Sequence, residues 1–409
     1  MRIGIYGGTF SPVHNGHVIM AQSFLKQMEL DKLYIISTCL PPHKAEVDGA
    51  SAYERMDMCT LAFGGIDRVC VSDIEIKRGD KSYTVDTLRE LKGEGELYFL
   101  CGSDMFLTLE SWREPAEIFK LAHIVLGRRE SDELIGIRLK EYKTLLEEKY
   151  GARIHEISFP AIEVSSSDIR ERVGRLESVN ALVPEKVERY IYANGLYRGE
   201  DSPGIKEIRR RVRTMMSEKR YLHTLGVERE CASLARIFAP EKCERLRAAA
   251  LLHDITKEYT PEKHAEFCEK YALDVSESMK KNPKLYHAFT GAHLAKALFP
   301  ESTDEKVFDA ITYHTTGRRG MTLCDMLLYL ADYIEDTRTF EDCVRLRRYF
   351  YDGISKKMTA EERYKHLLST LLLSFDMTVK NLTDEGAYID AVTLDAREYI
   401  KEELEKHTN

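Results

Sequence analysis

The chain has 409 residues, too many for one ordinary domain, so two or three domains are expected. Its composition, 43% hydrophobic and 31% charged, excludes wholesale disorder. A net charge of −8 argues against non-specific nucleic-acid binding, which needs a strongly basic surface. No apolar run approaches the roughly 18 residues that span a bilayer. Nine scattered cysteines without a CxxC pair predict free thiols in a reducing cytoplasm.

Short apolar runs alternate with helical patterns in the first half of the chain. Such alternation predicts a parallel sheet covered by helices, an α/β Rossmann-like fold whose ligands bind at the carboxyl ends of the strands. The expected strands are 2–6, 33–37, 69–73, 97–101, 123–127 and 154–159. The expected helices include 17–29, 52–63, 84–92 and 167–174.

The second half has helical periodicity throughout and predicts an all-α domain. The expected helices are 205–220, 221–238, 240–257, 261–271, 285–298, 304–314, 321–336, 340–352 and 359–380. RGEDSPG (198–204) has the composition of a linker, so we expect domains at 1–198 and 205–409 joined by 199–204. The basic run KEIRRRVR (206–213) predicts a solvated helix face, with a phosphate-facing or RNA-facing patch as the alternative.

A glycine turn and two histidines, in GGTFSPVHNGH, follow the first strand directly. Gly7 and Gly8 permit a tight turn and close approach of a ligand to the backbone, and Gly16 leaves room for a base or ribose. His14 and His17 are three residues apart at an expected helix start, whose N–H groups favour phosphate. Two imidazoles there can steady charge that develops on a phosphate. Metal ligation and an incidental surface position are the alternatives, and the sequence has no P-loop motif.

Further motifs follow in order along the same half. PPHK (41–44) comes after the second strand, followed by SYT (82–84), GSD (102–104), the only tryptophan, and VSSSDIRERV (164–173). The serines are strong N-cap residues, so a plain helix cap is one reading of the last motif. Together with the glycine–histidine segment, the set resembles bacterial nicotinate-nucleotide adenylyltransferases of the nucleotidylyltransferase superfamily over residues 1–197. Many members carry Asp where this chain has Ser11.

This resemblance implies adenylyl transfer, in which the 5′-phosphate of nicotinate mononucleotide attacks the α-phosphorus of ATP and pyrophosphate leaves. The nucleophile is already ionised, so catalysis would consist of positioning and charge neutralisation, with Mg²⁺ on the triphosphate. The catalytic residues it implies are His14, His17, Lys44 and Arg170. The ATP-binding residues it implies are Gly7, Gly8, Thr9, Phe10, Gly16, Gly102, Asp104, Ser165 and Ser166. Those for nicotinate mononucleotide are Ser82, Tyr83, Thr84 and Trp112, and another acceptor such as pantetheine phosphate is the alternative.

The helical half contains histidines and aspartates on apolar helices or at their ends. His253 and Asp254 end the run RAAALLHD, and Asp332 lies in LLYLADYIED. A charged Asp beside a buried helix is costly unless something binds it, and a divalent metal would do so. Imidazoles and carboxylates without thiolates suit Fe, Mn, Co or Zn. The candidate ligands are His223, His253, Asp254, His287, His314 and Asp332, with Asp325 as the alternative carboxylate.

The order H…HD…H…H…D resembles the HD phosphohydrolase superfamily. The segments YLHTLGV, LLHDITK, LYHAFTGA, YHTTGRRGM and ADYIED make residues 205–395 similar to bacterial HD enzymes that split diadenosine tetraphosphate into two ADP. The resemblance implies two metal ions, with iron favoured, which lower the pKa of an attacking water. One ion would be held by His223, His253, Asp254 and Asp332, and the other by Asp254, His287 and His314.

The same resemblance gives Asp254 and Lys257 catalytic roles. Polyphosphate contacts are expected from Thr256, Lys257, Arg318 and Gly320, although Lys257 and Arg318 could each be ordinary surface cations. The sequence therefore predicts a bifunctional enzyme acting on ATP, nicotinate mononucleotide and diadenosine tetraphosphate, without nucleic-acid or membrane partners. Hydrolysis of another nucleotide phosphoester, and a non-catalytic nucleotide-binding regulator, stay open for the helical half.

Overall fold

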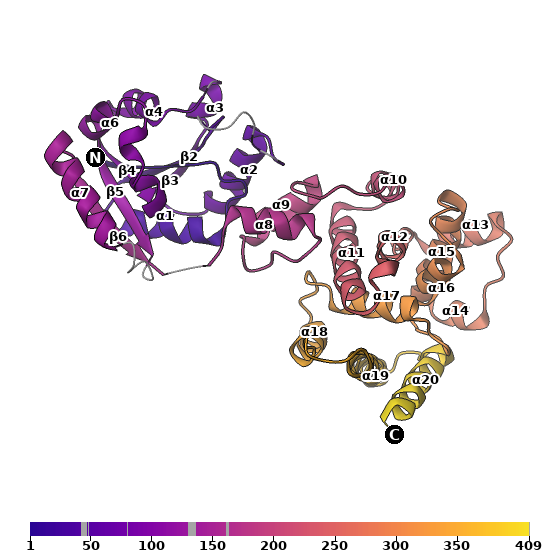
Figure 1. The fold of residues 1–409 in the computed structure, drawn as a ribbon. Coiled ribbons are helices and arrows are strands. Elements are labelled where there is room, and N and C mark those ends of the chain that lie inside the picture. The colour runs from indigo at the N-terminus through magenta and orange to yellow at the C-terminus, as the bar shows by residue number, and fades with distance from the viewer. Residues whose placement is uncertain (42–46, 48, 80, 130–135, 161–162, 409) are drawn as a thin grey trace. The chain divides into compact units, whose positions relative to one another are not determined.

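A computed structural model describes residues 1–41, 47, 49–79, 81–129, 136–160 and 163–408 (Figure 1). The chain forms two compact units. The N-terminal unit comprises residues 1–175 and 179–199, and the C-terminal unit comprises residues 176–178 and 200–409. None of the described helices is long and apolar enough to cross a membrane.

The N-terminal unit contains the expected parallel sheet, which has six strands in the order β3-β2-β1-β4-β5-β6. The strands are β1 (Arg2–Gly8), β2 (Lys32–Ser37), β3 (Val69–Ser72), β4 (Glu96–Gly102), β5 (Ala122–Arg129) and β6 (Ile154–Phe159). The order of the strands reverses between β1 and β4, and this switch point is where open α/β sheets bind ligands. The carboxyl ends of β1 and β4 therefore locate the site.

Helices cover both faces of this sheet (Figure 1). They are α1 (Asn15–Gln27), α2 (Ala52–Phe63), α3 (Ile74–Arg78), α4 (Thr84–Leu91), α5 (Ser103–Phe106), the 3-10 turn η1 (Leu109–Ser111), α6 (Pro115–Leu121), α7 (Gly136–Tyr150), α8 (Ser166–Gly174) and α9 (Glu185–Asn194). Alternation along β1 separates the two layers, because Ile3 and Ile5 join the core under α4, α6 and α7. A Cβ at Gly4 would instead meet Phe24 of α1 at 3.0 Å.

The C-terminal unit is entirely helical among its described residues, as expected. It contains α10 (Pro203–Val212), α11 (Glu218–Phe238), η2 (Pro240–Lys242), α12 (Cys243–Leu252), α13 (Pro261–Lys270), α14 (Glu277–Lys281), η3 (Pro283–Leu285), α15 (Tyr286–Leu298), α16 (Glu305–Tyr313), α17 (Leu323–Ile334), α18 (Glu341–Gly353), α19 (Ala360–Asp384) and α20 (Ala391–Thr408).

Two helix boundaries were predicted wrongly, and two helices were not predicted. The break expected at residue 220 lies earlier, because the Ser217 side chain accepts a hydrogen bond from the N–H of Arg220 and starts α11 at Glu218. The helix expected to run to residue 257 ends at Leu252, so His253 and Asp254 lie just beyond α12. The prediction also lacked α14 and α20.

The segment predicted as a linker folds in part onto the C-terminal unit. The Asp201 carboxylate pairs with Arg209 and Arg247, and the Ser202 side chain caps α10. Arg209 also donates to both oxygens of the fully buried Glu228, at 2.7 and 2.6 Å. The solvated-face interpretation of the basic run was therefore wrong for Arg209, because its guanidinium compensates a buried carboxylate on the neighbouring helix.

Candidate active sites

A cavity of about 510 Å³ opens at the carboxyl ends of β1 and β4. It is lined by all nine residues expected to bind ATP, which are Gly7, Gly8, Thr9, Phe10, Gly16, Gly102, Asp104, Ser165 and Ser166. The two histidines expected to be catalytic, His14 and His17, line it as well. Gly7 and Gly8 had been expected to form a turn, but they are the last residues of β1. A Cβ on Gly7 would project into open space, which leaves the backbone accessible. Lys44 lies outside the described residues.

The two histidines cap the first helix reciprocally. His14 precedes α1, and its Nδ1 accepts from the N–H of His17 at 3.3 Å. Nδ1 of His17 accepts from the N–H of His14 at 3.1 Å, and the rings stack 3.6 Å apart. Because Nδ1 is the acceptor in each neutral imidazole, the proton resides on Nε2. Both side chains line the cavity as hydrogen-bond donors suited to phosphate oxygen.

Gly16 has a more local role than the one predicted. A Cβ at this position would meet the His14 ring at 3.1 Å and Val164 at 3.3 Å. The absent side chain therefore makes room for the protein's own imidazole, although Gly16 also lines the cavity.

The serine-rich segment forms the start of α8 at the edge of this cavity. Ser165 caps the helix through the N–H of Asp168, and the Ser166 hydroxyl donates to the Pro12 carbonyl at 2.9 Å. Arg170 donates to the Ser11 carbonyl at 2.6 Å and does not line the cavity. These contacts hold α8 against the loop after β1, which gives Arg170 a positioning role in this arrangement. The helix N–H groups remain the groups suited to phosphate.

A second cavity, of about 480 Å³, shares Gly7, Gly8, Thr9 and Met105 with the first. It contains all four residues expected to bind the pyridine nucleotide: Ser82, Tyr83, Thr84 and Trp112. The Trp112 indole donates to Thr108 at 3.1 Å and packs edge-on against Phe99, which fixes the plane of the ring. The two cavities meet at the end of β1.

Sequence reasoning missed two charged residues of this second cavity. Glu75 is buried and accepts from Thr87 at 2.8 Å, and burial raises the pKa of Glu75. Arg113 lies 4.6 Å from the centre of the Tyr83 ring. Its position directly after Trp112 was the only signal in the sequence.

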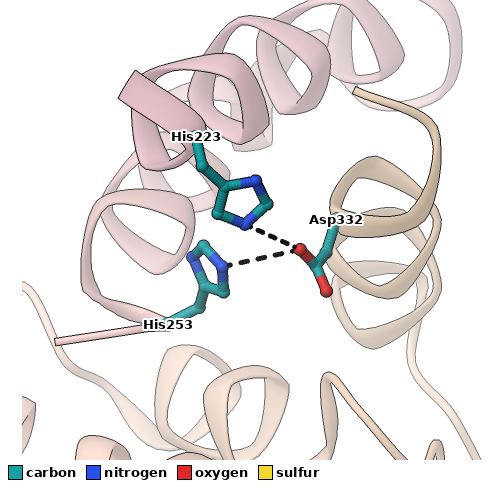
Figure 2. Close-up of side chains that lie close together, drawn as sticks. All are labelled: His223, His253 and Asp332. Carbon is teal, nitrogen blue, oxygen red and sulfur yellow. Dashed lines mark ion pairs between the residues drawn. The ribbon is translucent and has the colours of Figure 1, made fainter. Parts of the chain in front are cut away.

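The C-terminal unit brings all six predicted metal ligands together. Nε2 of His223, on α11, and Nε2 of His253 approach the same oxygen of Asp332, on α17, at 3.1 and 3.7 Å (Figure 2). Asp254 lies at the centre and presents a different oxygen to each side. Its Oδ2 lies 3.7 Å from His223 and 3.4 Å from His253.

The other oxygen of Asp254 faces the second histidine pair. Oδ1 lies 3.4 Å from Nε2 of His287 and 3.7 Å from Nε2 of His314. Two groups of side chains each offer ligand atoms close enough together to hold one ion. The first group is His223, His253 and Asp332, and the second is His253, Asp254 and His314. The carboxylate of Asp254 is therefore placed to bridge two sites.

The ring orientation of the four histidines fits metal ligation. In three of them Nδ1 donates to a backbone carbonyl at 2.6–2.7 Å. His253 donates to Ala250, His287 to Lys284 and His314 to Ile311. In His223, Nδ1 lies 3.1 Å from Oε1 of the buried Glu335. These bonds direct each Nε2 toward the centre of the cluster, the arrangement found around metals. Within the described structure, Nε2 of His223 and His253 and Oδ1 of Asp254 are buried without a hydrogen-bond partner.

The protonation states of His287, His314 and Asp254 agree with this fit. Burial lowers the pKa of His287 and His314, so both imidazoles are neutral at neutral pH, the form that binds metal. Burial opposes ionisation of Asp254, but the surrounding histidines hold its pKa well below its usual range. His223 differs: burial opposes its charge, but Asp332 and Glu335 raise its pKa to about 9.

Three cations contact the cluster, and the sequence had indicated only one of them. Lys257 Nζ lies 2.9 Å from Nε2 of His287, as expected for a cation beside the site. Arg220 donates to Asp254 at 2.8 Å, and Arg338 donates to Asp332 at 2.6 Å. Arg220 precedes His223 by one helical turn, and Arg338 follows Asp332 by six residues, so both were recognisable only once the ligands were placed.

Two expected polyphosphate ligands have other partners. The fully buried Thr256 hydroxyl donates to the carbonyl of His287 and contacts Thr290, which ties the segment to α15. Arg318 pairs with Asp309 and Asp325 at 2.9 Å, and Asp325 also caps α17, so this carboxylate is engaged away from the cluster. Gly320 has φ +75°, and a Cβ there would meet open space.

Comparison with known proteins agrees with the division into two units. Residues 5–172 match the Cytidylyltransferase-like family. The probable nicotinate-nucleotide adenylyltransferase of Thermoanaerobacter sp. (strain X514) is 36% identical over 209 residues, which are 50% of this chain and 98% of the relative. The chain belongs, through its N-terminal half, to the nicotinate-nucleotide adenylyltransferase family. The corresponding protein of Dictyoglomus thermophilum is 39% identical over 200 residues, covering 48% of this chain and all of the relative.

The C-terminal half contains an HD domain, matched over residues 220–336. This match spans all six candidate ligands, from His223 to Asp332. A crystal structure described as a predicted HD superfamily hydrolase involved in NAD metabolism, from Clostridium acetobutylicum, is 35% identical. The match covers 50% of this chain and 100% of the Clostridium chain, with a TM-score of 0.43. The chain thus joins an adenylyltransferase-family unit to an HD domain.

Proposed function

We propose that the N-terminal unit transfers the adenylyl group of ATP to nicotinate mononucleotide and releases pyrophosphate. The observation that carries this proposal is the pair of cavities that meet at Gly7, Gly8 and Thr9. One is lined by imidazole donors and a helix start, which suit a triphosphate. The other is lined by Trp112 and small polar groups, which suit an aromatic ring with a polar substituent. Relatives that carry the corresponding name support the assignment.

Each part of the N-terminal site would act by positioning the phosphates of ATP or by neutralising their negative charge. Nε2–H of His14 and His17 would donate to phosphate oxygens that gain charge during the transfer. The start of α8 would hold the outer phosphates of ATP. Asp104 is the only carboxylate among the described residues that line the ATP cavity, and its oxygens are ligands that Mg²⁺ accepts. No general base is required, because the attacking phosphate is already ionised.

A substrate panel tests this proposal. The purified chain is mixed with ATP and, separately, with nicotinate mononucleotide, nicotinamide mononucleotide and pantetheine phosphate, and pyrophosphate release is measured. The nicotinate compound should react fastest, and His17→Ala should lower kcat by at least about 100-fold, as expected for loss of a transition-state donor. Preferential reaction of pantetheine phosphate would refute the assignment.

We propose that the HD domain hydrolyses diadenosine tetraphosphate symmetrically to two ADP, with two transition-metal ions, of which iron is favoured. The observation behind it is the placement of Asp254, whose two oxygens face separate histidine pairs. His223, His253, Asp254 and Asp332 would hold one ion, and Asp254, His287 and His314 the other. The metals would supply the positive charge that acidifies water and neutralises phosphate oxygens. Lys257 and Arg220 would bind phosphate oxygens beside them.

Metal analysis and product analysis test the second activity together. The chain is purified without chelators, its bound metal is measured, and diadenosine tetraphosphate is added. ADP as the sole product supports symmetrical cleavage, and Asp254→Ala should abolish both metal binding and turnover. AMP with ATP would mean an asymmetric cut. Bound metal without turnover would refute hydrolysis of diadenosine tetraphosphate and favour another nucleotide phosphoester as substrate or a nucleotide-binding regulator.

A further inference from the structure

A third cavity, of about 480 Å³, lies in the C-terminal unit beside the histidine–aspartate cluster. Its lining combines Lys257, Lys280, Lys284, Tyr259, Tyr286, His264 and His287 with two prolines and an alanine. No acidic side chain is among the described residues that line it, although the whole chain is acidic. A cavity with three ammonium groups and no carboxylate favours a multiply charged anion.

The wall of this cavity is aromatic. His264 is buried between two tyrosines, with its ring centre 5.6 Å from Tyr259 and 5.7 Å from Tyr286. Nδ1 of His264 bonds to Thr290 at 2.9 Å, which anchors the imidazole to α15, the helix that also carries Tyr286. The tyrosine rings are tilted by 48° and 39° against the imidazole and offer aromatic contact to a nucleobase, because every base has a π-face.

The cavity borders the proposed metal cluster at His287. His287 lines the cavity and also faces Oδ1 of Asp254 at 3.4 Å. Lys257 lines it too, with Nζ 2.9 Å from Nε2 of His287. A ligand that places its terminal phosphate at the cluster would therefore extend past Lys257 toward the other lysines and the tyrosines.

We propose that this cavity, which we call the lysine–tyrosine pocket, binds one nucleoside diphosphate half of the dinucleotide substrate. The phosphates contact Lys257, Lys280 and Lys284, and the base packs against Tyr259 and Tyr286. The inference rests on the proposed hydrolase function and assigns it a substrate-binding subsite. It also explains how a dinucleotide is presented in one register, because one diphosphate fills the pocket and the next phosphorus reaches the cluster.

The test uses the full-length, metal-loaded chain and ADP as the probe. Hydrogen–deuterium exchange is followed in peptides covering 257–265 and 280–287 during an ADP titration. The N-terminal unit is also proposed to bind an adenine nucleotide, so a global signal would mix the two sites. ADP should protect these peptides. The double variant Lys280→Ala/Lys284→Ala should weaken that protection about tenfold, as expected for two lost charge-assisted contacts.

Matched variants keep the interpretation specific. Lys281→Ala removes a lysine from the same helix that does not line the pocket, so it should leave the ADP titration unchanged. Tyr259→Phe should retain binding and Tyr259→Leu should weaken it, because only the ring is required. In the hydrolysis assay, the double variant should raise KM about tenfold with little change in kcat.

The outcomes separate this proposal from the hydrolase proposal. ADP protection that depends on Lys280 and Lys284, without any hydrolysis, supports the pocket and removes the hydrolase. Hydrolysis with normal KM in the double variant, and no ADP protection of the pocket peptides, overturns the pocket and leaves the hydrolase intact. Equal effects of the double variant and Lys281→Ala would also overturn the pocket.

Discussion

The buried charge network between α10, α11 and α12 provides a quantitative test of the C-terminal fold. Glu228 is fully buried and accepts from Arg209 twice and from Arg247 at 3.0 Å. Glu228→Gln keeps the size of the side chain but removes the negative charge. Two largely buried guanidinium groups would then share only the Asp201 carboxylate.

The size of the effect follows from burial. Breaking a buried ion pair costs about 3–5 kcal/mol, and because Asp201 remains we expect a loss of about 3 kcal/mol in the free energy of unfolding. Helix α10, which carries Arg209, also supplies the control. Arg210 and Glu207 form an equally good two-point pair, at 2.9 and 2.8 Å, but their side chains are 71% and 47% exposed. Glu207→Gln should therefore cost about 0–1 kcal/mol.

The assay must report on one unit at a time. Hydrogen exchange of α11 and α12 peptides measures the opening free energy of the C-terminal unit. Trp112, the only tryptophan, lies in the N-terminal unit, so its fluorescence should give the same urea midpoint in both variants. If Glu228→Gln and Glu207→Gln lie within 1 kcal/mol of each other (about the size of one surface pair), the reasoning from burial is wrong.

Three further predictions concern individual side chains. Glu335→Gln should weaken metal binding at His223 by about 10-fold or more, measured by competition with a chelator, because the imidazole loses its carboxylate partner; unchanged metal content would contradict this. Burial raises the pKa of Glu230 to about 7, against 4.5 for a free glutamate. The folded state therefore holds a proton that the unfolded chain releases, and stability should fall by about 3 kcal/mol as pH rises through this window. Glu230→Gln should flatten the pH dependence of the opening free energy of α11. Arg113→Gln should raise KM for nicotinate mononucleotide a few-fold, roughly one exposed charge contact, and leave KM for nicotinamide mononucleotide unchanged.

The parts of the structure that sequence predicts best are those that rest on local pattern. The strands of the sheet appear as apolar runs, and the histidine–aspartate cluster is visible because charged residues such as Asp254 stand beside apolar helices. Arg209 shows where this reasoning fails. Its basic neighbours suggest a solvated face, and its buried partner Glu228 lies on the following helix.

The same limit applies within the sites. The sequence alone gave Arg220 and Glu335 no role, because their importance depends on which ligand each one touches. The role expected for Thr256 rested on motif position alone, and the role expected for Gly16 rested on the small size of glycine. In the structure, the Thr256 hydroxyl bonds to the His287 carbonyl of α15, and the missing side chain of Gly16 leaves room for the His14 imidazole. A motif therefore predicts the location of a site more reliably than it predicts the function of each residue in that site.

The reciprocal cap at the start of α1 has a consequence for mutagenesis. Each imidazole accepts the backbone N–H of the other residue, so replacing either histidine removes the anchor of its neighbour as well. The kinetic losses of His14→Ala and His17→Ala should consequently overlap, and the double variant should lose much less than their product. Rate constants from the single variants would then describe a coupled pair, and neither number would belong to one residue alone.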